Sequence, residues 1–384
     1  METVQIDFNQ SERASLGVEM EFALVDRDTG ELVSAASDML GVLGQGHPDG
    51  VHPNAKHELF ECTVEVITDV CTTVAEARAD LARTIELVSA EAKGRGLALI
   101  CVGTHPFSRW RDQTVSPNPR YADLVEEMQW TALRLQIFGV HFHVGVRSAE
   151  KSIAIANALC AYLPHLLALA ASSPYWEGHD TGLASCRSKV FEGLPTAGLP
   201  YRMADWAEFE QFMETLVNAQ AIRTIREVWW DIRPHPIFGT VELRMCDGIP
   251  TLREVTALAA LAQSLVEWLD RRIDAGEELP APSEWVVREN KWLAARHGLD
   301  AQFIVDERGN RRPARDEIVA LVDGLEPVAR SLDCGAELTG IAAILEHGPS
   351  YQRQRAVVER GGTLADVVAS LVAELASDSP GAAP

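Results

Sequence analysis

Four short segments of the chain place acidic, histidine or arginine side chains at alternate positions, with apolar residues between them. They span residues 17–22, 61–66, 140–144 and 241–245. In a β-strand, successive side chains point to opposite faces, so all the polar groups of each segment would share one face. Carboxylates gathered on one face repel one another unless a cation lies among them, and divalent cations with oxygen ligands are a common solution. The pattern therefore predicts a cation-binding sheet face.

The residues expected to point together form four pairs. They are Glu19 with Glu21, Glu61 with Glu65, His141 with His143, and Glu242 with Arg244. A single strand of this kind is ordinary, because half-buried strands turn their polar side to water. Four strands rich in carboxylate and poor in lysine favour a functional site over a solvated surface.

The composition limits the classes of function. The 384 residues are 47% apolar, and 34 basic against 56 acidic residues give a net charge of -22. This acidity argues against a nucleic-acid or anionic membrane surface, whereas an ATP pocket stays open because metal ions can offset local charge. The seven cysteines are scattered without a Cys-x-x-Cys pair, so we expect reduced thiols and a cytoplasmic protein. The first residues lack the features of a signal peptide, and we expect no export.

Hydrophobic periodicity predicts strands and helices without a regular βαβ repeat. Expected strands span residues 15–26, 57–68, 97–102 and 138–147, with two extended pieces within 228–247. Expected helices span residues 73–93, 119–137, 152–171, 206–219, 251–272, 290–297, 316–332, 336–347 and 363–376. Segment 152–171 is interrupted by Asn157 and Pro164, which favours a buried core helix over a membrane span. Segment 41–53 is expected to be a loop.

No Walker or Rossmann glycine motif occurs, so phosphate chemistry would need another scaffold. Taken in order, residues 16–22, 64–68, 139–144, 240–244 and 289–292 resemble the type 2 glutamate-cysteine ligase family, whose bacterial members are often called carboxylate-amine ligases. The similarity runs from about residue 12 to about residue 370, and includes segments 187–188, 230–234 and 348–354. The resemblance implies an α+β, glutamine-synthetase-like fold: a curved, mostly antiparallel sheet forms a funnel with helices packed outside. Such a funnel holds ATP, two or three Mg²⁺ ions (or Mn²⁺) and the acid substrate.

This resemblance implies one catalytic domain over residues 1–376, with a sheet core at about 12–250 and a helical part at about 251–376. We expect residues 377–384 to form a disordered tail. Carried over by motif position, the implied metal ligands are Glu19, Glu21, Glu58, Glu65, His141 and Glu242.

The position of Glu58 conflicts with strand alternation. On one regular strand it has the opposite parity to Glu65, unless a bulge or a strand start near Leu59 intervenes. Glu61 has the right parity and is the substitute candidate. His143 shares a face with His141, and is either a cofactor-binding site residue or an imidazole satisfied by a core hydrogen bond.

Amide formation requires that a carboxylate oxygen become a leaving group, most simply by phosphoryl transfer from ATP to give an acyl phosphate. Arg244 is placed to contact the transferring phosphoryl group, where one donor contributes on the order of 2 to 4 kcal/mol; the alternative is a structural salt bridge to Glu242. Arg187 and Arg233 are further candidates for binding phosphate or the substrate carboxylate, or for structural capping. A basic run is expected to be a solvated loop rather than an ATP clamp; it contains Arg308, Arg311, Arg312 and Arg315.

Three functions fit the residues. The favoured one is an ATP- and Mg²⁺-dependent ligase that joins L-glutamate or a similar acid to cysteine or another amine. A zinc or manganese hydrolase could use His141, His143 and the nearby acids, but barrel hydrolases of that kind need βα repeats. A catalytically silent binding protein is disfavoured because every expected acid is present. The family resemblance also suggests a homodimer.

Overall fold

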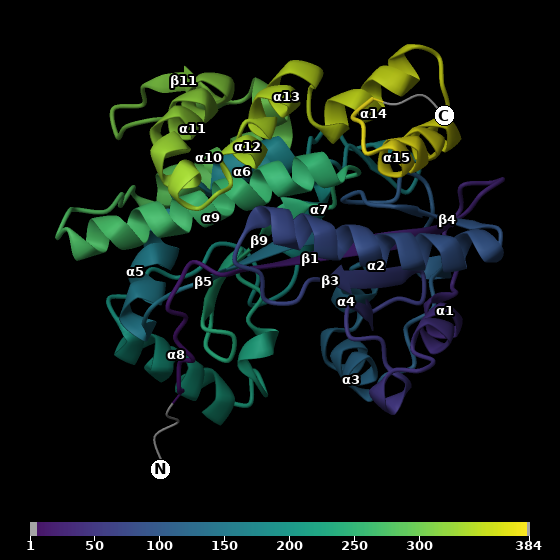
Figure 1. Cartoon of the computed structure of the whole chain (residues 1–384), viewed down its shortest axis with the longest axis horizontal. Coiled ribbons are helices and arrows are strands. Elements are labelled where there is room, and N and C mark those ends of the chain that lie inside the picture. Colours follow the sequence, from purple (N-terminus) through teal and green to yellow (C-terminus); the bar gives the residue numbers. More distant parts are fainter. Residues whose placement is uncertain (1–5, 382–384) are drawn as a thin grey trace.

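The computed structural model describes residues 6–381 and contains a seven-stranded sheet with helices on both sides (Figure 1). The strand order is β2-β3-β1-β5-β9-β8, and β4 also pairs with β1. Every neighbouring pair is antiparallel, and the sheet is open. The strands are β1 (Leu16–Asp26), β2 (Ala55–His57), β3 (Thr63–Ile67), β4 (Leu97–Ile100), β5 (Gly139–Gly145), β8 (Ile232–His235) and β9 (Thr240–Asp247). The predicted α+β class with an antiparallel sheet is confirmed.

Strand β1 is the centre of this sheet. Its residues from Glu19 to Ala23 pair with β3, and those from Leu16 to Met20 pair with β5 on the opposite edge. The alternation along β1 is clear: Val18, Met20 and Phe22 are fully buried in the main core, whereas the glutamates between them are half-buried on the other face. One face of β1 therefore packs in the core, and the other face carries the acidic side chains.

Two long helices cover the apolar face of the sheet. Helices α2 (Val74–Gly94) and α9 (Leu252–Asp274) lie along it in Figure 1. Each begins at a threonine N-cap that accepts a hydrogen bond from the backbone N–H three residues later. Their buried leucines, such as Leu81 and Leu261, stabilise the fold by about 1.5 to 3 kcal/mol each. This layer fixes the strands that carry the acidic residues.

Other helices surround the sheet, some of them on its polar side. They are α1 (Ala36–Leu43), α3 (Pro119–Met128), α4 (Trp130–Leu133), α5 (Ala149–Leu159), α6 (Leu163–Ala170), α7 (Cys186–Phe191) and α8 (Trp206–Asn218). In Figure 1, α3, α4 and α8 lie on the side of the sheet opposite α2 and α9, whereas α1 packs against α2 at the edge of the sheet. Two short strands, β6 (Tyr175–Trp176) and β7 (His179–Asp180), form a separate hairpin. The start of the expected loop 41–53 is in fact the end of α1.

Two predicted helices are broken in the structure. The expected helix 152–171 is the pair α5 and α6, bent by 65°. Pro164 lies in the first turn of α6, where its missing N–H is tolerated, although it could not continue α5. The expected helix 119–137 ends at Gln129, whose φ of 48° separates α3 from α4. Among residues 6–381, no single helix is long and apolar enough to cross a membrane, and α5 with α6 meets that test only as a bent pair.

The C-terminal part is helical, as predicted, with one helix that the periodicity did not reveal. It contains α10 (Glu284–His297), β10 (Gln302–Ile304), β11 (Arg311–Pro313), α11 (Ala314–Ser331), α12 (Gly335–Leu338), α13 (Gly340–His347), α14 (Ser350–Glu359) and α15 (Leu364–Ser377). The unpredicted α14 carries Arg353, which is ion-paired to Glu254 of α9 and Glu374 of α15. The tail was expected to be disordered from Ser377, but Ser377 ends α15 and Asp378 is ion-paired to Arg78. Residues 382–384 lie outside the described part.

Candidate active site

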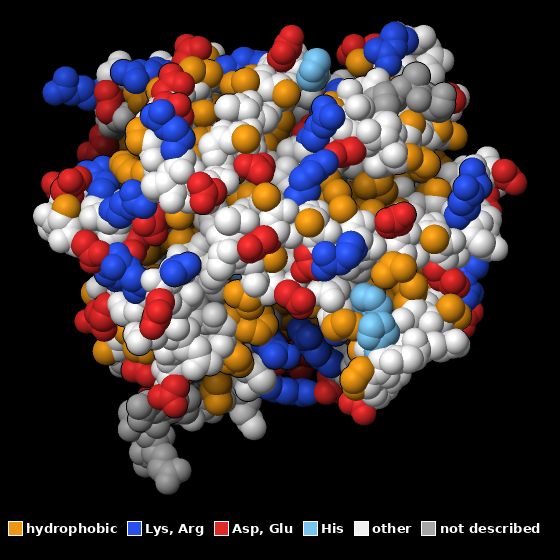
Figure 2. All heavy atoms as spheres, in the orientation of Figure 1, with side chains coloured by type: hydrophobic (Ala, Val, Ile, Leu, Met, Phe, Trp, Pro, Cys, Tyr) orange, Lys and Arg blue, Asp and Glu red, His pale blue; other side chains and the backbone are white. Residues whose placement is uncertain are grey.

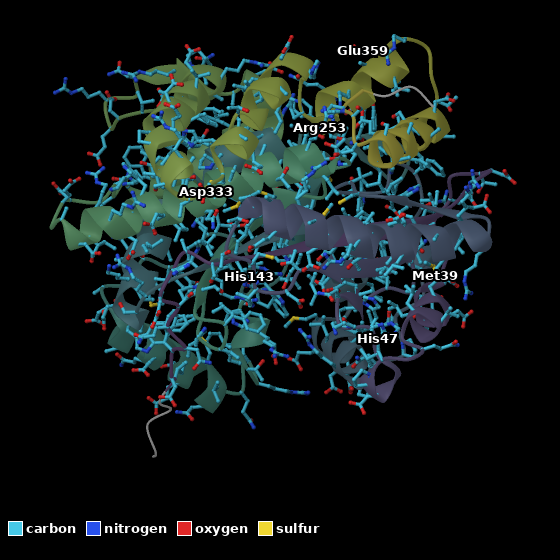
Figure 3. All side chains as sticks on the ribbon, in the orientation of Figure 1. Met39, His47, His143, Arg253, Asp333 and Glu359 are labelled. Carbon is cyan, nitrogen blue, oxygen red and sulfur yellow. The ribbon has the colours of Figure 1, made fainter. Side chains whose placement is uncertain are left out.

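A cavity of about 780 Å³ opens on the polar face of the sheet. Figure 2 shows a hollow below the sheet where basic and acidic side chains gather, and Figure 3 places His143 near the centre of the molecule. All ten side chains predicted to form the site line this cavity: Glu19, Glu21, Glu58, Glu65, His141, His143, Arg187, Arg233, Glu242 and Arg244. The structure thus brings together residues from five separate stretches of the chain.

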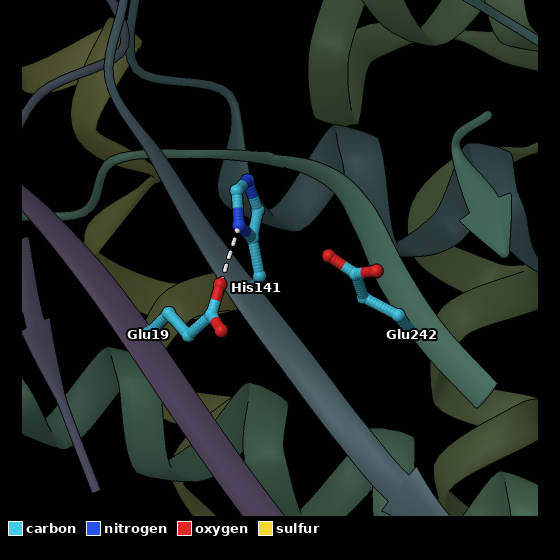
Figure 4. Close-up of side chains that lie close together, drawn as sticks. All are labelled: Glu19, His141 and Glu242. Atoms are coloured by element: carbon cyan, nitrogen blue, oxygen red, sulfur yellow. Dashed lines mark hydrogen bonds and ion pairs between the residues drawn. The ribbon is translucent and has the colours of Figure 1, made fainter. Parts of the chain in front are cut away.

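The first group, here called the histidine cluster, comprises Glu19, His141 and Glu242 (Figure 4). One ligand atom from each lies within 4.8 Å of the others. Glu19 of β1 and His141 of β5 are directly opposite in the strand register, and Nδ1 of the imidazole is 3.1 Å from a Glu19 oxygen. The register of β5 against β9 shifts between Val140 and Phe142, as at a bulge, which changes the aim of His141 toward β9.

Basic groups of the chain itself neutralise the histidine cluster. Arg233 donates from Nε to Glu242 over 2.8 Å, and Arg244 is ion-paired to the other oxygen of the same carboxylate. His143 contacts both acids, with Nε2 at 3.2 Å from Glu19 and 3.7 Å from Glu242. Burial would raise the pKa of the Glu242 carboxyl, but the two guanidinium groups hold it well below its usual range. The negative charge of this cluster is therefore present without any added ion.

The pKa values of the two imidazoles shift in opposite directions. Burial and, to a smaller extent, the charge of Arg244 lower the pKa of His141 to about 4. Burial also disfavours a charged His143, but Glu242 and Glu19 outweigh it and raise the pKa of His143. His141 is consequently a neutral imidazole near pH 7, the form that can bind a metal ion.

The second group, here called the three-glutamate cluster, comprises Glu21, Glu58 and Glu65. Glu21 of β1 and Glu65 of β3 are opposite in the register, and oxygen atoms of all three carboxylates lie within 4.8 Å of one another. Within residues 6–381, no Lys, Arg or His side chain comes within ion-pair distance of these three acids. Burial, reinforced by Glu58, raises the pKa of Glu21 to about 8. Burial also raises the pKa of Glu58, and that of Glu65 lies well above its usual range.

The three-glutamate cluster fits a hard divalent cation. Three carboxylates held this close repel when ionised, so without a cation they retain protons. An ion such as Mg²⁺ prefers carboxylate oxygens and would allow all three to ionise. The histidine cluster, with two carboxylates and one neutral imidazole, is a second suitable donor set.

Glu58 belongs to the cavity and Glu61 does not, because the expected strand 57–68 is wrong. The chain leaves β2 at His57 and enters β3 only at Thr63, so strand parity does not apply between Glu58 and Glu65. The Ser116 hydroxyl donates to the Glu58 carbonyl over 2.6 Å and holds this turn. The Glu61 carboxylate instead accepts hydrogen bonds from the hydroxyl and the N–H of Ser37, at the start of α1.

Arg187 enters the site from the short helix α7. Its Nη1 donates to the Arg244 carbonyl over 3.2 Å, and its Nη2 lies 3.4 Å from His141 Nε2. Gly139 makes room for it, because a Cβ there would lie 2.2 Å from Arg187 Nη2. The Nε atoms of both Arg187 and Arg244 are buried and have no hydrogen-bond partner among the described residues. Both side chains line the cavity, where a guanidinium group is suited to bind an anion.

Two supporting residues were given no role by the sequence analysis. The ring of Phe191 lies beneath both Arg187 and Arg244, with the guanidinium carbons 5.7 and 5.8 Å from its centroid. Lys291, within one of the family-like segments, is buried and ion-paired to Asp231, whose carbonyl accepts a hydrogen bond from the Arg244 N–H. Because Lys291 belongs to a largely polar helix, its sequence context did not predict that it would be buried in an ion pair.

The arginine run lies outside the cavity. Arg308, Arg311, Arg312 and Arg315 belong to the β10–β11 hairpin and the start of α11, and none of them lines the cavity. Arg312 is ion-paired to Glu317 at 3.2 Å, and Arg315 donates to the Leu345 carbonyl. These contacts agree with the solvated-loop interpretation.

Known proteins are similar to this chain over nearly its whole length. The chain is 53% identical to "Putative glutamate--cysteine ligase 2" of Thermobifida fusca, over 98% of this chain and 94% of that protein. It is 56% identical to "Putative glutamate--cysteine ligase 2-1" of Frankia alni, over 98% of this chain and 99% of that protein.

Two solved structures share the fold at low sequence identity. One is a glutamate-cysteine ligase from Francisella tularensis in complex with AMP, with a TM-score of 0.69 at 13% identity over 97% of this chain and 90% of that chain. The other is a bifunctional glutathione synthetase from Pasteurella multocida, with a TM-score of 0.71 at 15% identity over 95% of this chain and 53% of that chain. The model of the family described as "Glutamate-cysteine ligase family 2(GCS2)" matches residues 15–370. The chain therefore belongs to the glutamate-cysteine ligase family 2.

Proposed function

We propose that this protein is an ATP- and Mg²⁺-dependent carboxylate-amine ligase that joins the γ-carboxyl group of L-glutamate to the amine of cysteine. The observation that carries the proposal is that two donor clusters share strand β1 and open into the same cavity as two arginines. Glu19 and Glu21 belong to different clusters, and Arg187 and Arg244 reach the same cavity. This arrangement suits a reaction that handles several negative charges at once.

The donor clusters would hold the metal ions. Glu21, Glu58 and Glu65 would bind one Mg²⁺, and Glu19, His141 and Glu242 another. Bound Mg²⁺ supplies charge neutralisation for the phosphate oxygens. Mn²⁺ has the same ligand preferences and could substitute.

The arginines would stabilise the charge that develops on the phosphoryl group. A carboxylate oxygen of glutamate attacks the γ-phosphorus of ATP, ADP leaves, and an acyl phosphate forms. The amine then attacks the acyl carbon, and phosphate leaves with the amine proton. The guanidinium groups of Arg187 and Arg244 line the cavity and are held by His141, Glu242 and the Phe191 ring, so little reorganisation is needed when this charge appears. Arg233, bound to Glu242 and to two backbone carbonyls, would position that carboxylate.

We infer that residues 1–376 act as one catalytic domain, with the sheet at about 12–250 and helices at about 251–376. Support comes from the main core, which contains Val18 and Leu243 of the sheet together with Leu261 and Ile341 of the helical part. A homodimer and a cytoplasmic location stay predictions.

The test is phosphate release from ATP with Mg²⁺ and L-glutamate, with cysteine compared against a panel of other amines and the product identified by mass spectrometry. Cysteine-dependent release with a γ-glutamylcysteine mass would support the whole proposal. Release with another amine only would keep the ligase mechanism and replace the acceptor. Hydrolysis that needs Zn²⁺ and no nucleotide would overturn the proposal in favour of a metal hydrolase.

A further inference from the structure

One side chain of the cavity is exposed although it is large and apolar. Phe238 has 55% of its surface accessible, and it is the one large hydrophobic side chain more than a third exposed among the described residues that line the cavity. It lies in the turn between β8 and β9. This ring is open to water inside the cavity, so its burial against a bound ligand would be favourable.

The Phe238 ring is part of a stack. It lies parallel to the His235 ring, with centroids 4.2 Å apart and an interplanar angle of 14°. The N–H of Phe238 donates to His235 Nδ1 over 3.3 Å, which fixes the imidazole against the same turn. Burial lowers the pKa of His235 to about 4, so this ring is uncharged near pH 7. The pair presents a flat, neutral aromatic surface.

The turn that carries this stack is held firmly. Asn9 accounts for much of this, since its N–H donates to the Pro236 carbonyl and its side-chain amide donates to the Ile237 carbonyl over 2.7 Å. Gly239 adopts a φ of +64°, and a Cβ there would lie 1.4 Å from the Asn9 carbonyl oxygen, so the packing leaves no room for a side chain. Little backbone entropy is then lost when a ligand contacts Phe238.

A single residue joins the stack to the histidine cluster. The His143 ring meets Phe238 edge to face at 5.6 Å and His235 at 5.7 Å, while its Nε2 atom contacts Glu19 and Glu242. A nucleotide with its phosphates near the histidine cluster can therefore extend toward this aromatic surface. The other aromatic carbocycles that line the cavity among the described residues are less open: Tyr121 and Phe191 are buried, and Trp229 is half-buried. The Tyr121 hydroxyl also donates to the His57 carbonyl.

We propose that Phe238, stacked on His235, is the platform on which the adenine base of ATP lies. The inference deepens the proposed ligase function and rests on its ATP requirement. Stacking on an aromatic face is tolerant of the base, so the platform contributes affinity for the base and leaves the phosphates to the metal clusters. The platform is a binding residue pair and takes no part in the chemical step.

The experiment compares Phe238→Ala with Ile237→Ala, a matched control. Ile237 is in the same turn and 53% exposed, but it does not line the cavity. Isothermal titration with Mg²⁺ measures the Kd of ATP and of inorganic tripolyphosphate, which has phosphates and no base. We expect Phe238→Ala to weaken ATP binding about 10-fold and to leave tripolyphosphate binding unchanged. Ile237→Ala should leave both constants within about twofold, and Phe238→Trp should retain ATP affinity because it keeps an aromatic face.

Three outcomes would overturn the inference. An unchanged ATP Kd in Phe238→Ala would show that the base does not lie on this ring. Equal weakening of ATP and tripolyphosphate would show that Phe238 only shapes the cavity. No ATP binding by the wild-type protein would overturn the proposed function, and this inference with it, whereas the first two outcomes leave the ligase proposal standing.

Discussion

The two donor clusters of the cavity solve the same electrostatic problem in opposite ways. The histidine cluster is surrounded by Arg233, Arg244 and His143, so its carboxylates are ionised within the folded chain itself. The three-glutamate cluster has no basic side chain within ion-pair distance among the described residues, and burial raises the pKa of its carboxyl groups. Removing one acid should consequently have different effects on stability in the two clusters.

The difference indicates which part of the site is complete before any ligand arrives. A carboxylate paired to two arginines is a structural element as well as a ligand, because those arginines need it in return. The three protonated glutamates, in contrast, balance no basic side chain of the fold, so the loss of one of them leaves no buried charge without a partner. We therefore expect the three-glutamate cluster to depend more on a bound cation than the histidine cluster does.

The largest expected effect is on activity, from Glu21→Gln. The variant loses one ligand of the three-glutamate cluster without disturbing an ion pair, so ATP turnover should fall about a thousandfold, equivalent to about 4 kcal/mol of transition-state stabilisation. Its melting temperature without metal should stay at or above the wild-type value. Steady-state kinetics and calorimetry on the same preparation check both points. Near-normal turnover would contradict a metal role for this acid.

The matched change in the histidine cluster is Glu242→Gln, for which we expect loss of stability together with loss of activity. Glu242 is 1% exposed, and the neutral glutamine would leave the buried Arg233 and Arg244 without their charged partner. Such a break typically costs about 3 to 5 kcal/mol in free energy of unfolding. Urea denaturation of both Glu242→Gln and Glu21→Gln measures their free energies of unfolding. An equal loss of stability in the two variants would contradict the difference between the clusters.

A smaller effect is expected from Arg244→Lys. The lysine keeps the charge beside Glu242 but loses the planar guanidinium and its unused Nε donor. We expect kcat to fall about 100-fold with little change in melting temperature. Arg312→Lys serves as the control, because Arg312 is exposed outside the cavity and should show wild-type kinetics. A wild-type kcat in Arg244→Lys would indicate that this arginine serves only to balance Glu242.

The smallest effect is a pH dependence confined to the three-glutamate cluster. Because the folded-state pKa of Glu21 is about 8 and lies above its unfolded value, the metal-free carboxyl stays protonated below that pH, and its ionisation costs folding free energy as the pH rises. Mg²⁺ must displace the proton, so its affinity should rise about 10-fold per pH unit for each proton displaced, up to pH 8. Titration calorimetry in buffers of different ionisation enthalpy measures the protons released. Glu21→Gln should release fewer, and equal release would contradict the assignment.

Strand alternation was sufficient to place seven of the ten candidate site residues on one face of the sheet. Glu19, Glu21, Glu65, His141, His143, Glu242 and Arg244 all belong to β1, β3, β5 and β9, where the period of two holds. The same reasoning misjudged Glu58 because the chain leaves the strand there, held by Ser116 from a distant segment. Phe238 gave no signal either, since an exposed aromatic in a turn differs from a buried one only through tertiary contacts.

The predictions of the helices failed at positions where local features break or hide the apolar periodicity. Apolar periodicity continued through Pro164 and Gln129, so it could not reveal the bend between α5 and α6 or the break after α3. Helix α14 is polar along most of its length and showed no periodic stripe. Its position is set by the ion pairs of Arg353, which only the folded chain brings together.

Strand β1 contributes one glutamate to each cluster, two residues apart. An extended chain advances about 3.3 to 3.4 Å per residue, so the backbone alone sets a spacing of about 7 Å between these two positions. Movements of loops or repacking of helices cannot change this spacing unless the central strand of the sheet is broken. In a relative that keeps both glutamates on this strand, the two clusters keep the same separation, so a change of substrate selectivity would have to come from the walls of the cavity. Specificity and reactivity can thus diverge independently in this fold.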